Sequence, residues 1–290
     1  MTKILANDGI SQAGVDALTT KGFTIVTEHV TQDDLINTIN TKEYEVLLVR
    51  SATTVRKDLI DACPHLKIIG RGGVGMDNID VDYARKKGIN VINTPAASSA
   101  SVAELVFAHL FGMVRFLFDS NRQMPLTGDS DFKGLKKSYT NGRELAGKTL
   151  GIIGFGRIGK EVAKRAIGLG MNVMAHDKFV EEANITLEFF NGEKKSFTIE
   201  TESLENVLKN SDFVTLHVPK IGDKAVIGAE EIGMMKTGTG IVNAARGGVI
   251  DETALMFALD KKKLAYAGLD VFENEPTPSI HLCMHNAVSL

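Results

Sequence analysis

An apolar run followed by three spaced glycines stands in the middle of the chain: Thr149-Leu150-Gly151-Ile152-Ile153-Gly154-Phe155-Gly156-Arg157-Ile158-Gly159. A G-x-G-x-x-G pattern alone is a weak signal in a chain with 28 glycines, so its context decides its meaning. Residues 149–153 have the pattern of a buried strand, and helical spacing follows from 156 to 169. The next apolar run ends at Asp177, about 20 residues after the glycines. The stretch therefore predicts a βαβ unit that binds a dinucleotide.

Each part of this unit has a physical role. Gly154 allows the tight turn, Gly156 lets the backbone touch a pyrophosphate, and Gly159 lets the helix pack closely on the strand. The N-terminus of the helix offers free N–H groups to phosphates. Asp177 would accept hydrogen bonds from ribose hydroxyls and repel a 2′-phosphate, so we expect NAD rather than NADP. An ordinary glycine-rich turn and a solvated strand-end acid are the alternatives.

Alternating strands and helices extend this unit in both directions. Further strands are expected at 172–176, 213–217, 241–244, 266–269 and 287–290, and in the first ninety residues at 4–6, 23–26, 46–49, 68–69 and 89–92. Asn191-Gly192 lies between two alternating runs, 185–190 and 195–199, and predicts an inserted β-hairpin. The pattern indicates an α/β protein with two doubly wound parallel-sheet domains.

We expect a first domain over 1–96 and a second over 97–290, with a connecting helix at 98–118. That helix is apolar nearly all round, so it must be buried on most sides, between domains or in a subunit interface. Residues 121–141 are polar and are expected to form a loop or arm. A homodimer built on the long helix follows from this interpretation.

Composition excludes several classes of protein. With 43% apolar and 24% charged residues, the 290-residue chain is globular rather than disordered. Its 33 Lys and Arg against 36 Asp and Glu give a net charge of −3, which disfavours nucleic-acid binding. Two cysteines cannot form a disulfide framework, and no signal-peptide core or membrane span is evident, so a cytoplasmic location is expected. No metal site is expected.

Charged residues follow several predicted strands, where open α/β sheets bind ligands. They are three arginines and two acids: Arg50, Arg71, Arg246, Asp270 and Glu275. Arginines in these places suit an anionic, phosphorylated substrate, although each could be a solvated loop charge. The glycine-rich turn 72–75, which includes Gly73 and Val74, could offer N–H groups to a carboxylate. His109 and His217 are expected to be packed rather than catalytic.

Taken together, these motifs resemble the D-isomer-specific 2-hydroxyacid dehydrogenases, and within that family the phosphoglycerate dehydrogenases most closely. The similar stretches, in order, are 49–53 (VRSAT), 70–80 (GRGGVGMDNID), 93–104, 154–159, 216–219, 243–252 (NAARGGVIDE) and 268–276 (GLDVFENEP). The resemblance runs from about residue 3 to the last residue. It implies a flavodoxin-like substrate domain and a Rossmann NAD-binding domain.

The resemblance also implies roles for individual residues. Arg246 matches the arginine that binds the substrate carboxylate and keto oxygen beside the cofactor, and Glu275 matches the acid that pairs with a catalytic histidine. Arg50 and Arg71 match residues that contact the phosphorylated substrate. The remaining matches are cofactor positions: Arg157 and Ile158 on the pyrophosphate, Ala244 and Asp270 near the nicotinamide, and Val218 near the cofactor.

The catalytic histidine of the family is the one departure from the pattern. It follows an apolar strand, in a Pro-His-x-Gly motif. Here residues 286–290 resemble that strand and the sequence ends with it, while His281 and His285 precede it. The pattern therefore predicts a longer chain that supplies the histidine and a helix returning to the N-terminal domain.

The implied activity is NAD-dependent oxidation of a D-2-hydroxy acid by hydride transfer. With Arg50 and Arg71 present, the expected reaction converts 3-phosphoglycerate to 3-phosphohydroxypyruvate in serine biosynthesis. A hydroxypyruvate or glyoxylate reductase is the alternative within the same class. A non-catalytic NAD-sensing protein, similar to transcriptional co-repressors of this fold, is the alternative from another class.

Overall fold

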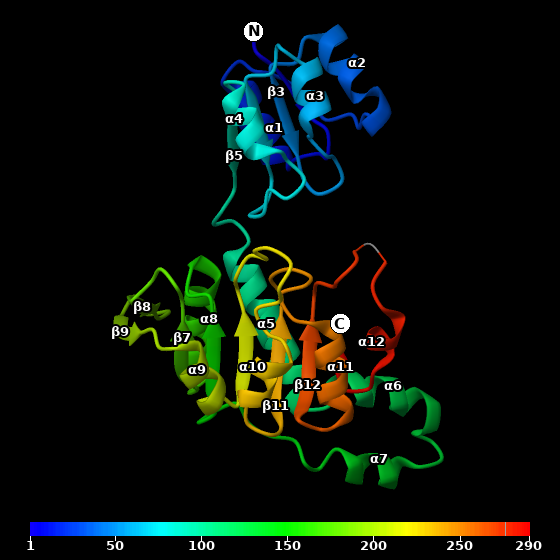
Figure 1. Ribbon diagram of the computed structural model, residues 1–290, viewed down its shortest axis with the longest axis vertical. Helices are drawn as coiled ribbons and strands as arrows, with labels where there is room; N and C mark the ends of the chain where they lie inside the picture. The colour runs from blue at the N-terminus through cyan, green and yellow to red at the C-terminus, as the bar shows by residue number, and fades with distance from the viewer. Residues whose placement is uncertain (276) are drawn as a thin grey trace. The chain divides into compact units, whose positions relative to one another are not determined.

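Two parallel sheets organise the protein. The computed structural model describes residues 1–275 and 277–290 (Figure 1). The chain divides into two compact units, 1–98 and 99–290, and each unit contains its own sheet and its own hydrophobic core. The expected α/β class with two doubly wound parallel sheets is confirmed.

Unit 1 is a five-stranded parallel sheet in the order β2-β1-β3-β4-β5, the flavodoxin-like arrangement. Its elements are β1 (Lys3–Ala6), α1 (Gln12–Thr20), β2 (Thr24–Val26), α2 (Gln32–Lys42), β3 (Val46–Val49), α3 (Lys57–Ala62), β4 (Ile68–Arg71), α4 (Val81–Lys86) and β5 (Asn90–Asn93). The strands are short apolar runs such as Val46-Leu47-Leu48-Val49, because strands with helices on the sheet's faces lie in the core.

The main sheet of unit 2 has six parallel strands in the order β13-β12-β11-β10-β6-β7. Its strands and the hairpin are β6 (Thr149–Ile153), β7 (Asn172–His176), β8 (Glu182–Glu188), β9 (Lys194–Glu200), β10 (Phe213–Leu216), β11 (Thr239–Asn243), β12 (Leu264–Leu269) and β13 (Val288–Ser289). Its helices are α5 (Ser99–Val114), α6 (Leu117–Thr127), α7 (Phe132–Ser138), α8 (Arg157–Gly168), α9 (Leu204–Asn210), α10 (Ala229–Met234), α11 (Glu252–Asp260) and α12 (Ile280–Met284).

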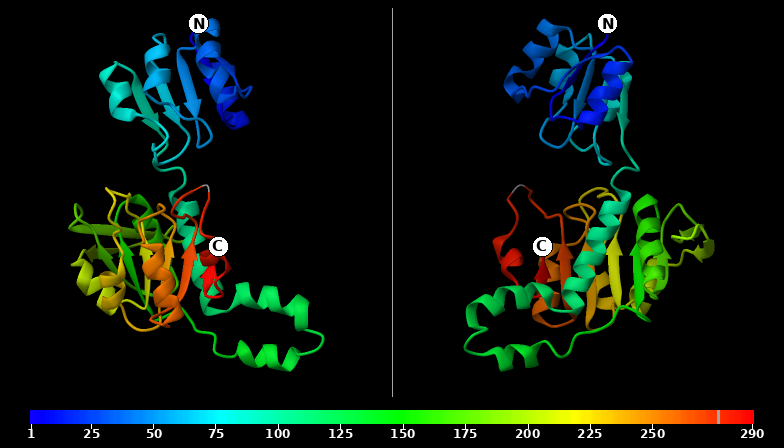
Figure 2. Two further views of the ribbon diagram at one scale, coloured as in Figure 1. Left: turned by 45° about the vertical axis from the view of Figure 1, so that its right-hand side comes forward. Right: turned by 180° about the vertical axis from the view of Figure 1, so that it is seen from behind.

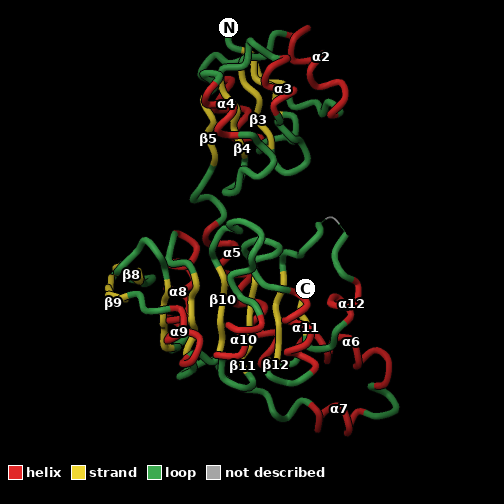
Figure 3. The backbone as a smooth tube through the Cα atoms, in the orientation of Figure 1, coloured by secondary structure: helices red, strands yellow, loops and turns green. Residues whose placement is uncertain are grey.

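Helices cover both faces of this six-stranded sheet (Figure 3). Helices α5 and α8 pack side by side on one face, and α9, α10 and α11 pack on the other. The two cores have no charged member, and fully buried side chains such as Leu150, Ile152 and Val214 fill them. All six strands point the same way, so the loops after β6, β10, β11 and β12 meet at one edge.

The expected hairpin is present as β8 and β9, which pair antiparallel in register from Glu182↔Glu200 to Glu188↔Lys194. The amide N–H of Gly192 donates to Phe189 O at 2.9 Å, and Gly192 takes the left-handed conformation with φ +83°. This is a tight turn closed by a glycine, as the Asn191-Gly192 pair indicates. The hairpin joins the main sheet through a parallel bridge between Ala175 and Thr201.

The prediction of one helix over 98–118 is wrong at its C-terminal end. Helix α5 ends at Val114, whose carbonyl accepts a 2.9 Å hydrogen bond from Arg143 N. Phe116 then turns left-handed (φ +55°) and its ring packs near Tyr139 and Tyr266, at 5.9 and 6.3 Å between ring centroids. The expected arm is two helices, α6 and α7, which extend from the sheet (Figure 2).

No single helix among the described residues is long and apolar enough to cross a membrane. Helices α5 and α6 reach that length and composition only as a pair, and the pair is bent by 53° at its junction.

Candidate active site

The glycine loop of unit 2 has the geometry that a dinucleotide needs. Gly154 follows β6 with φ +96°, and a Cβ there would lie 2.6 Å from the carbonyl oxygen of His217. A Cβ on Gly159 would overlap the carbonyl oxygen of Gly154, so helix and loop can pack this closely only with glycine. Gly156 caps α8, and a Cβ there would meet nothing within 4 Å, so the approach to the helix N-terminus is open.

Asp177 holds the loop from the neighbouring strand. Its Oδ2 accepts the Phe155 N–H at 2.6 Å, and its Oδ1 accepts the N–H groups of Phe179 and Val180 at 2.8 and 3.2 Å. A carboxylate has about four acceptor positions, so capacity remains for a ribose hydroxyl. The open helix N-terminus and this carboxylate fit the pyrophosphate and ribose of NAD. Arg157 is exposed at the start of α8, and Ile158 is half-buried against the core.

His217 and Val218 follow β10 beside the glycine loop. The His217 N–H donates to Ile153 O at 2.7 Å, and a Cβ on Gly154 would lie 2.8 Å from Val218 Cγ1. The His217 ring is buried and bonds Thr215 Oγ1 through Nε2 at 3.0 Å. Burial lowers the pKa of His217 to about 3, so the ring is neutral near pH 7. This geometry agrees with a packed histidine.

The loop after β11 carries Ala244 and Arg246, and the side chain of Asn243 shapes it. Asn243 is 2% exposed; its Oδ1 accepts Ala245 N–H at 3.1 Å, and its Nδ2 donates to Arg246 O at 2.9 Å. The Arg246 Nη1 donates to Ala245 O at 2.7 Å. A Cβ on Gly247 would overlap the carbonyl oxygen of Phe272, so this loop packs directly on the loop after β12.

Asp270 and Glu275 lie on that second loop. The Asp270 N–H donates to Asn243 O at 3.0 Å, which joins the two loops at their base. Burial raises the pKa of Asp270; the His109 ring lowers it in part, and the Glu275 charge raises it further. Glu275 Oε1 accepts Phe272 N–H at 2.8 Å, so the carboxylate closes its own turn. Pro276, beside Glu275, lies outside the described residues.

Histidines near the end of the chain have other partners. His285 Nδ1 accepts Ala287 N–H at 3.1 Å, and its Nε2 lies 3.5 Å from Asp260. His109 is buried in α5 as expected, with Nδ1 3.0 Å from Ser289 Oγ, and burial lowers its pKa despite the opposing Asp270 charge. In the described part of the chain, no hydrogen bond joins a histidine to Glu275.

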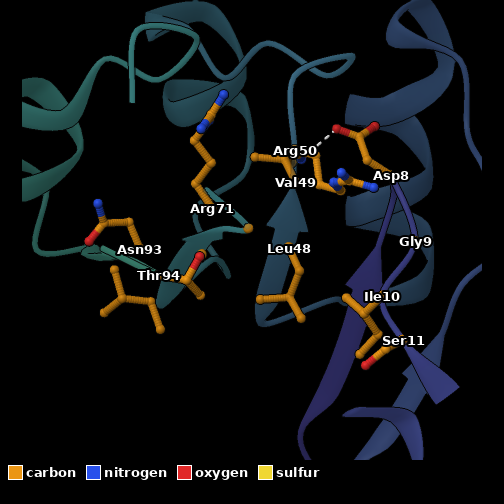
Figure 4. A pocket seen from close by; sticks show the side chains of 13 residues that line it. Asp8, Gly9, Ile10, Ser11, Leu48, Val49, Arg50, Arg71, Asn93 and Thr94 are labelled. Atoms are coloured by element: carbon orange, nitrogen blue, oxygen red, sulfur yellow. Dashed lines mark hydrogen bonds between the residues drawn. The ribbon is translucent and has the colours of Figure 1, made fainter. Parts of the chain in front are cut away.

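Unit 1 contains a separate cleft of about 610 Å³ at the carboxyl ends of its strands. Arg50 and Arg71 line it from the ends of neighbouring strands, and Asp8 lies on the side of Arg50 away from Arg71 (Figure 4). Gly73 and Val74 belong to the adjoining loop rather than to the lining. The Arg71 guanidinium lies against Gly73, and Val74 O accepts Asn93 Nδ2 at 2.7 Å.

Asp8 is a charged residue of this cleft that the sequence analysis missed. It accepts the N–H groups of Arg50 and Thr53 at 2.6 and 3.1 Å and the Thr53 hydroxyl at 2.5 Å. Burial raises the pKa of Asp8, but these donors and the His29 charge outweigh burial and lower it overall. Its place two residues after the end of β1 is the signal that could have identified it, since the arginines were identified by their places at strand ends.

Comparison with known proteins gives consistent matches. The family described as D-isomer specific 2-hydroxyacid dehydrogenase, NAD binding domain, matches residues 107–290. A hydroxypyruvate reductase of Thermotoga maritima is 42% identical over 276 residues, which cover 94% of this chain and 84% of that protein. A D-3-phosphoglycerate dehydrogenase of Methanocaldococcus jannaschii is 41% identical over 278 residues, which cover 95% of this chain and 50% of that protein.

Solved structures agree with these sequence matches. A glyoxylate reductase from Paecilomyes thermophila has a TM-score of 0.80 and 29% identity, covering 100% of this chain and 87% of that one. The chain thus spans about half the length of the phosphoglycerate dehydrogenase it matches, and most of the length of the two reductases.

Proposed function

Because this chain belongs to the D-isomer-specific 2-hydroxyacid dehydrogenase family, we propose that it oxidises a phosphorylated D-2-hydroxy acid with NAD, converting 3-phosphoglycerate to 3-phosphohydroxypyruvate. The observation that carries this choice is the pair Arg50 and Arg71 lining one cleft in unit 1. Two guanidinium groups suit a phosphate dianion, whereas an unphosphorylated hydroxy acid has a single carboxylate for them. The resemblance to phosphoglycerate dehydrogenases supports the same choice.

The residues of unit 2 bind the cofactor and act on the reacting end of the substrate. When bound, NAD supplies the hydride acceptor. The N–H groups at the start of α8 hold the pyrophosphate, and Asp177 holds a ribose hydroxyl. Arg246 binds the substrate carboxylate and polarises the C–O bond of the carbon that gives up its hydride. Glu275 orients the family's general-base histidine and stabilises its charged form.

Isothermal titration tests the substrate. We expect NAD-saturated protein to bind 3-phosphoglycerate more tightly than D-glycerate. Arg50→Ala and Arg71→Ala should each cost about 1.5–3 kcal/mol of 3-phosphoglycerate binding, the range for a hydrogen bond to a charged group, and leave D-glycerate nearly unchanged. Arg56→Ala is the matched control, because Arg56 pairs with Asp80 at 3.0 Å and does not line the cleft. Equal losses for both ligands would make the arginines structural and refute the substrate choice.

A hydroxypyruvate or glyoxylate reductase is the second candidate. The Thermotoga maritima reductase and the Paecilomyes thermophila structure favour it, since both align over most of their lengths. The same titration distinguishes the two candidates. Tight hydroxypyruvate binding to the NADH complex, unaffected by Arg50→Ala and Arg71→Ala, would favour the reductase.

A further inference from the structure

Asn78 joins the two strand-end loops of the unit 1 cleft. It lies in the loop between β4 and α4, and its side-chain amide makes three hydrogen bonds. Its Oδ1 accepts Arg71 Nε–H at 2.9 Å, while its Nδ2 donates to Arg50 O at 2.8 Å and to Thr53 O at 2.6 Å. The main chain reinforces the connection, because Val55 N donates to Asn78 O at 2.8 Å. One half-buried residue therefore contacts both arginine-bearing segments.

We propose that Asn78 is a positioning residue that fixes Arg71 relative to Arg50, so that the cleft binds a phosphate dianion in one geometry. This inference rests on the proposed function, in which the two arginines hold the phosphate. The bond to Nε sets the plane of the Arg71 guanidinium, and the bonds to two carbonyls hold the Arg50 segment at a fixed separation. Groups that are ordered before binding lose less entropy when the ligand arrives.

An amide suits this place better than other side chains of its size. A carboxylate could accept from Arg71 Nε, but it could not donate to Arg50 O and Thr53 O, and it would add negative charge beside an anion site. A hydroxyl is too short to make all three contacts. The neutral amide orients Arg71 without adding a negative charge of its own.

Two further contacts complete the arrangement. Asp8 holds Arg50 N and Thr53 in addition to the bonds from Asn78 to Arg50 O and Thr53 O, so two residues fix the Arg50–Thr53 segment. The Arg71 guanidinium lies so close to Gly73 that a Cβ there would overlap Nη1. Asn78 thus links the Arg71 side chain to a segment that Asp8 also holds.

A purely structural role is the competing explanation, and a matched variant separates the two. Asn40 is also half-buried in unit 1 and donates from Nδ2 to Ala62 O at 2.8 Å, but it does not line the cleft. Asn78→Ala and Asn40→Ala both remove side-chain bonds to a backbone carbonyl. Only Asn78→Ala removes a contact to an arginine of the cleft.

The experiment measures binding of 3-phosphoglycerate, D-glycerate and NAD to the full chain, with melting temperatures. We expect Asn78→Ala to lower the affinity for 3-phosphoglycerate about tenfold and to change the affinities for D-glycerate and NAD by no more than about twofold. Asn78→Asp should lower the affinity for 3-phosphoglycerate further, because the added negative charge repels the phosphate. Asn40→Ala should lower the melting temperature and leave all three affinities unchanged. In an Arg50→Ala, Arg71→Ala background, Asn78→Ala should cause no further loss of 3-phosphoglycerate binding.

Two outcomes would overturn the inference: unchanged 3-phosphoglycerate binding in Asn78→Ala, or an equal loss for D-glycerate. A second readout is independent of the substrate. The NMR signal of Arg71 Nε–H should be protected from solvent exchange, and Asn78→Ala should abolish that protection. If 3-phosphoglycerate binds no better than D-glycerate to the unmutated protein, the proposed substrate fails, while lost protection still supports positioning. Protection that persists in Asn78→Ala refutes positioning whatever the substrate is.

Discussion

We expect the choice between NAD and NADP to depend on Asp177. Its carboxylate accepts the Phe155 N–H of the glycine loop, a position from which it would bind a ribose hydroxyl and repel a 2′-phosphate. Asp177→Ala should lower the affinity for NAD about tenfold or more, which is the usual cost of losing hydrogen bonds to a charged group. The affinity for NADP should fall less. Titration of both cofactors checks this, with Asp16→Ala in α1 as the control. Equal affinities of the unmutated protein for NAD and NADP would contradict it.

Gly247 sets the position of Arg246. Any Cβ at 247 would overlap the Phe272 carbonyl oxygen, so Gly247→Ala must push the two loops apart. We expect a loss of about 1–3 kcal/mol in unfolding free energy, as for overpacking, together with weaker binding of the substrate carboxylate. Gly233→Ala in α10 is the control, because a Cβ there meets nothing within 4 Å. Urea unfolding and titration measure both effects; unaltered substrate affinity in Gly247→Ala would argue against this role.

Asp8 should contribute to stability above acidic pH. Its pKa is lowered from an ordinary value of 3.8, so the folded state favours the ionised form. The stabilisation is present above pH 3.8 and is lost as pH falls through the lowered folded pKa. Asp8→Asn should lower the unfolding free energy by about 1 kcal/mol at pH 7, a modest value because the group is half-exposed, and flatten the acid limb of the stability curve. If the unfolding free energies of the unmutated protein and Asp8→Asn fall in parallel as the pH is lowered, the Asp8 carboxylate makes no such contribution.

Single residues differ in how far sequence predicts them. The turn of the glycine loop and its closeness to Asp177 are predictable, because both depend on neighbours along one βαβ unit. Asp8 and Asn78 were missed, because their partners belong to other loops that only the folded sheet brings together. Asn243 was missed although its side-chain partners, Ala245 and Arg246, lie in its own loop. A polar side chain that closes a loop has no periodic pattern to indicate it.

Among the elements, the strands were the most predictable. All five expected strands of unit 1 and the six of the main sheet in unit 2 are present, as is the inserted hairpin, because short apolar runs and turn residues are local signals. The end of α5 was not predictable. Its apolar pattern continues past Val114, and a tertiary contact from Arg143 N and the left-handed turn at Phe116 end the helix.

Helix α5 has one buried and one accessible face, and we expect the two faces to have different roles. Phe107 is 5% exposed in the core of its own unit, whereas Phe111 is 40% exposed. We expect a homodimer through the accessible face, with Phe111→Asp giving a folded monomer and Phe107→Asp a protein that unfolds, since it buries a charge in the core. Sedimentation and circular dichroism measure both. A dimer that survives Phe111→Asp would rule out this interface.

On the scale of the whole molecule, the two units have separate cores, and we expect NAD and a phosphate anion to bind different units. NAD is expected to bind the glycine loop of unit 2. A ligand that binds only the folded state stabilises that state by about 2.7 kcal/mol when its free concentration is 100 times its Kd. Calorimetry should therefore show two unfolding transitions. NAD should raise the unfolding temperature of residues 99–290 only. Excess phosphate should bind the cleft of unit 1, so it should raise the unfolding temperature of residues 1–98 only. A single transition that NAD shifts as a whole would contradict separate unfolding.

The hairpin beside β7 has a consequence for solubility. Strand β7 is the last of its sheet, and an open last strand is a template on which another chain can add a strand and begin aggregation. Here the segment leaving the hairpin occupies part of that template, since Thr201 bridges Ala175 and Glu202 N donates to Ala175 O at 2.8 Å. Strand β9 of the hairpin begins with Lys194-Lys195 and ends at Glu200, and such charges discourage further strand addition. The insertion therefore protects the sheet against fibrous self-assembly.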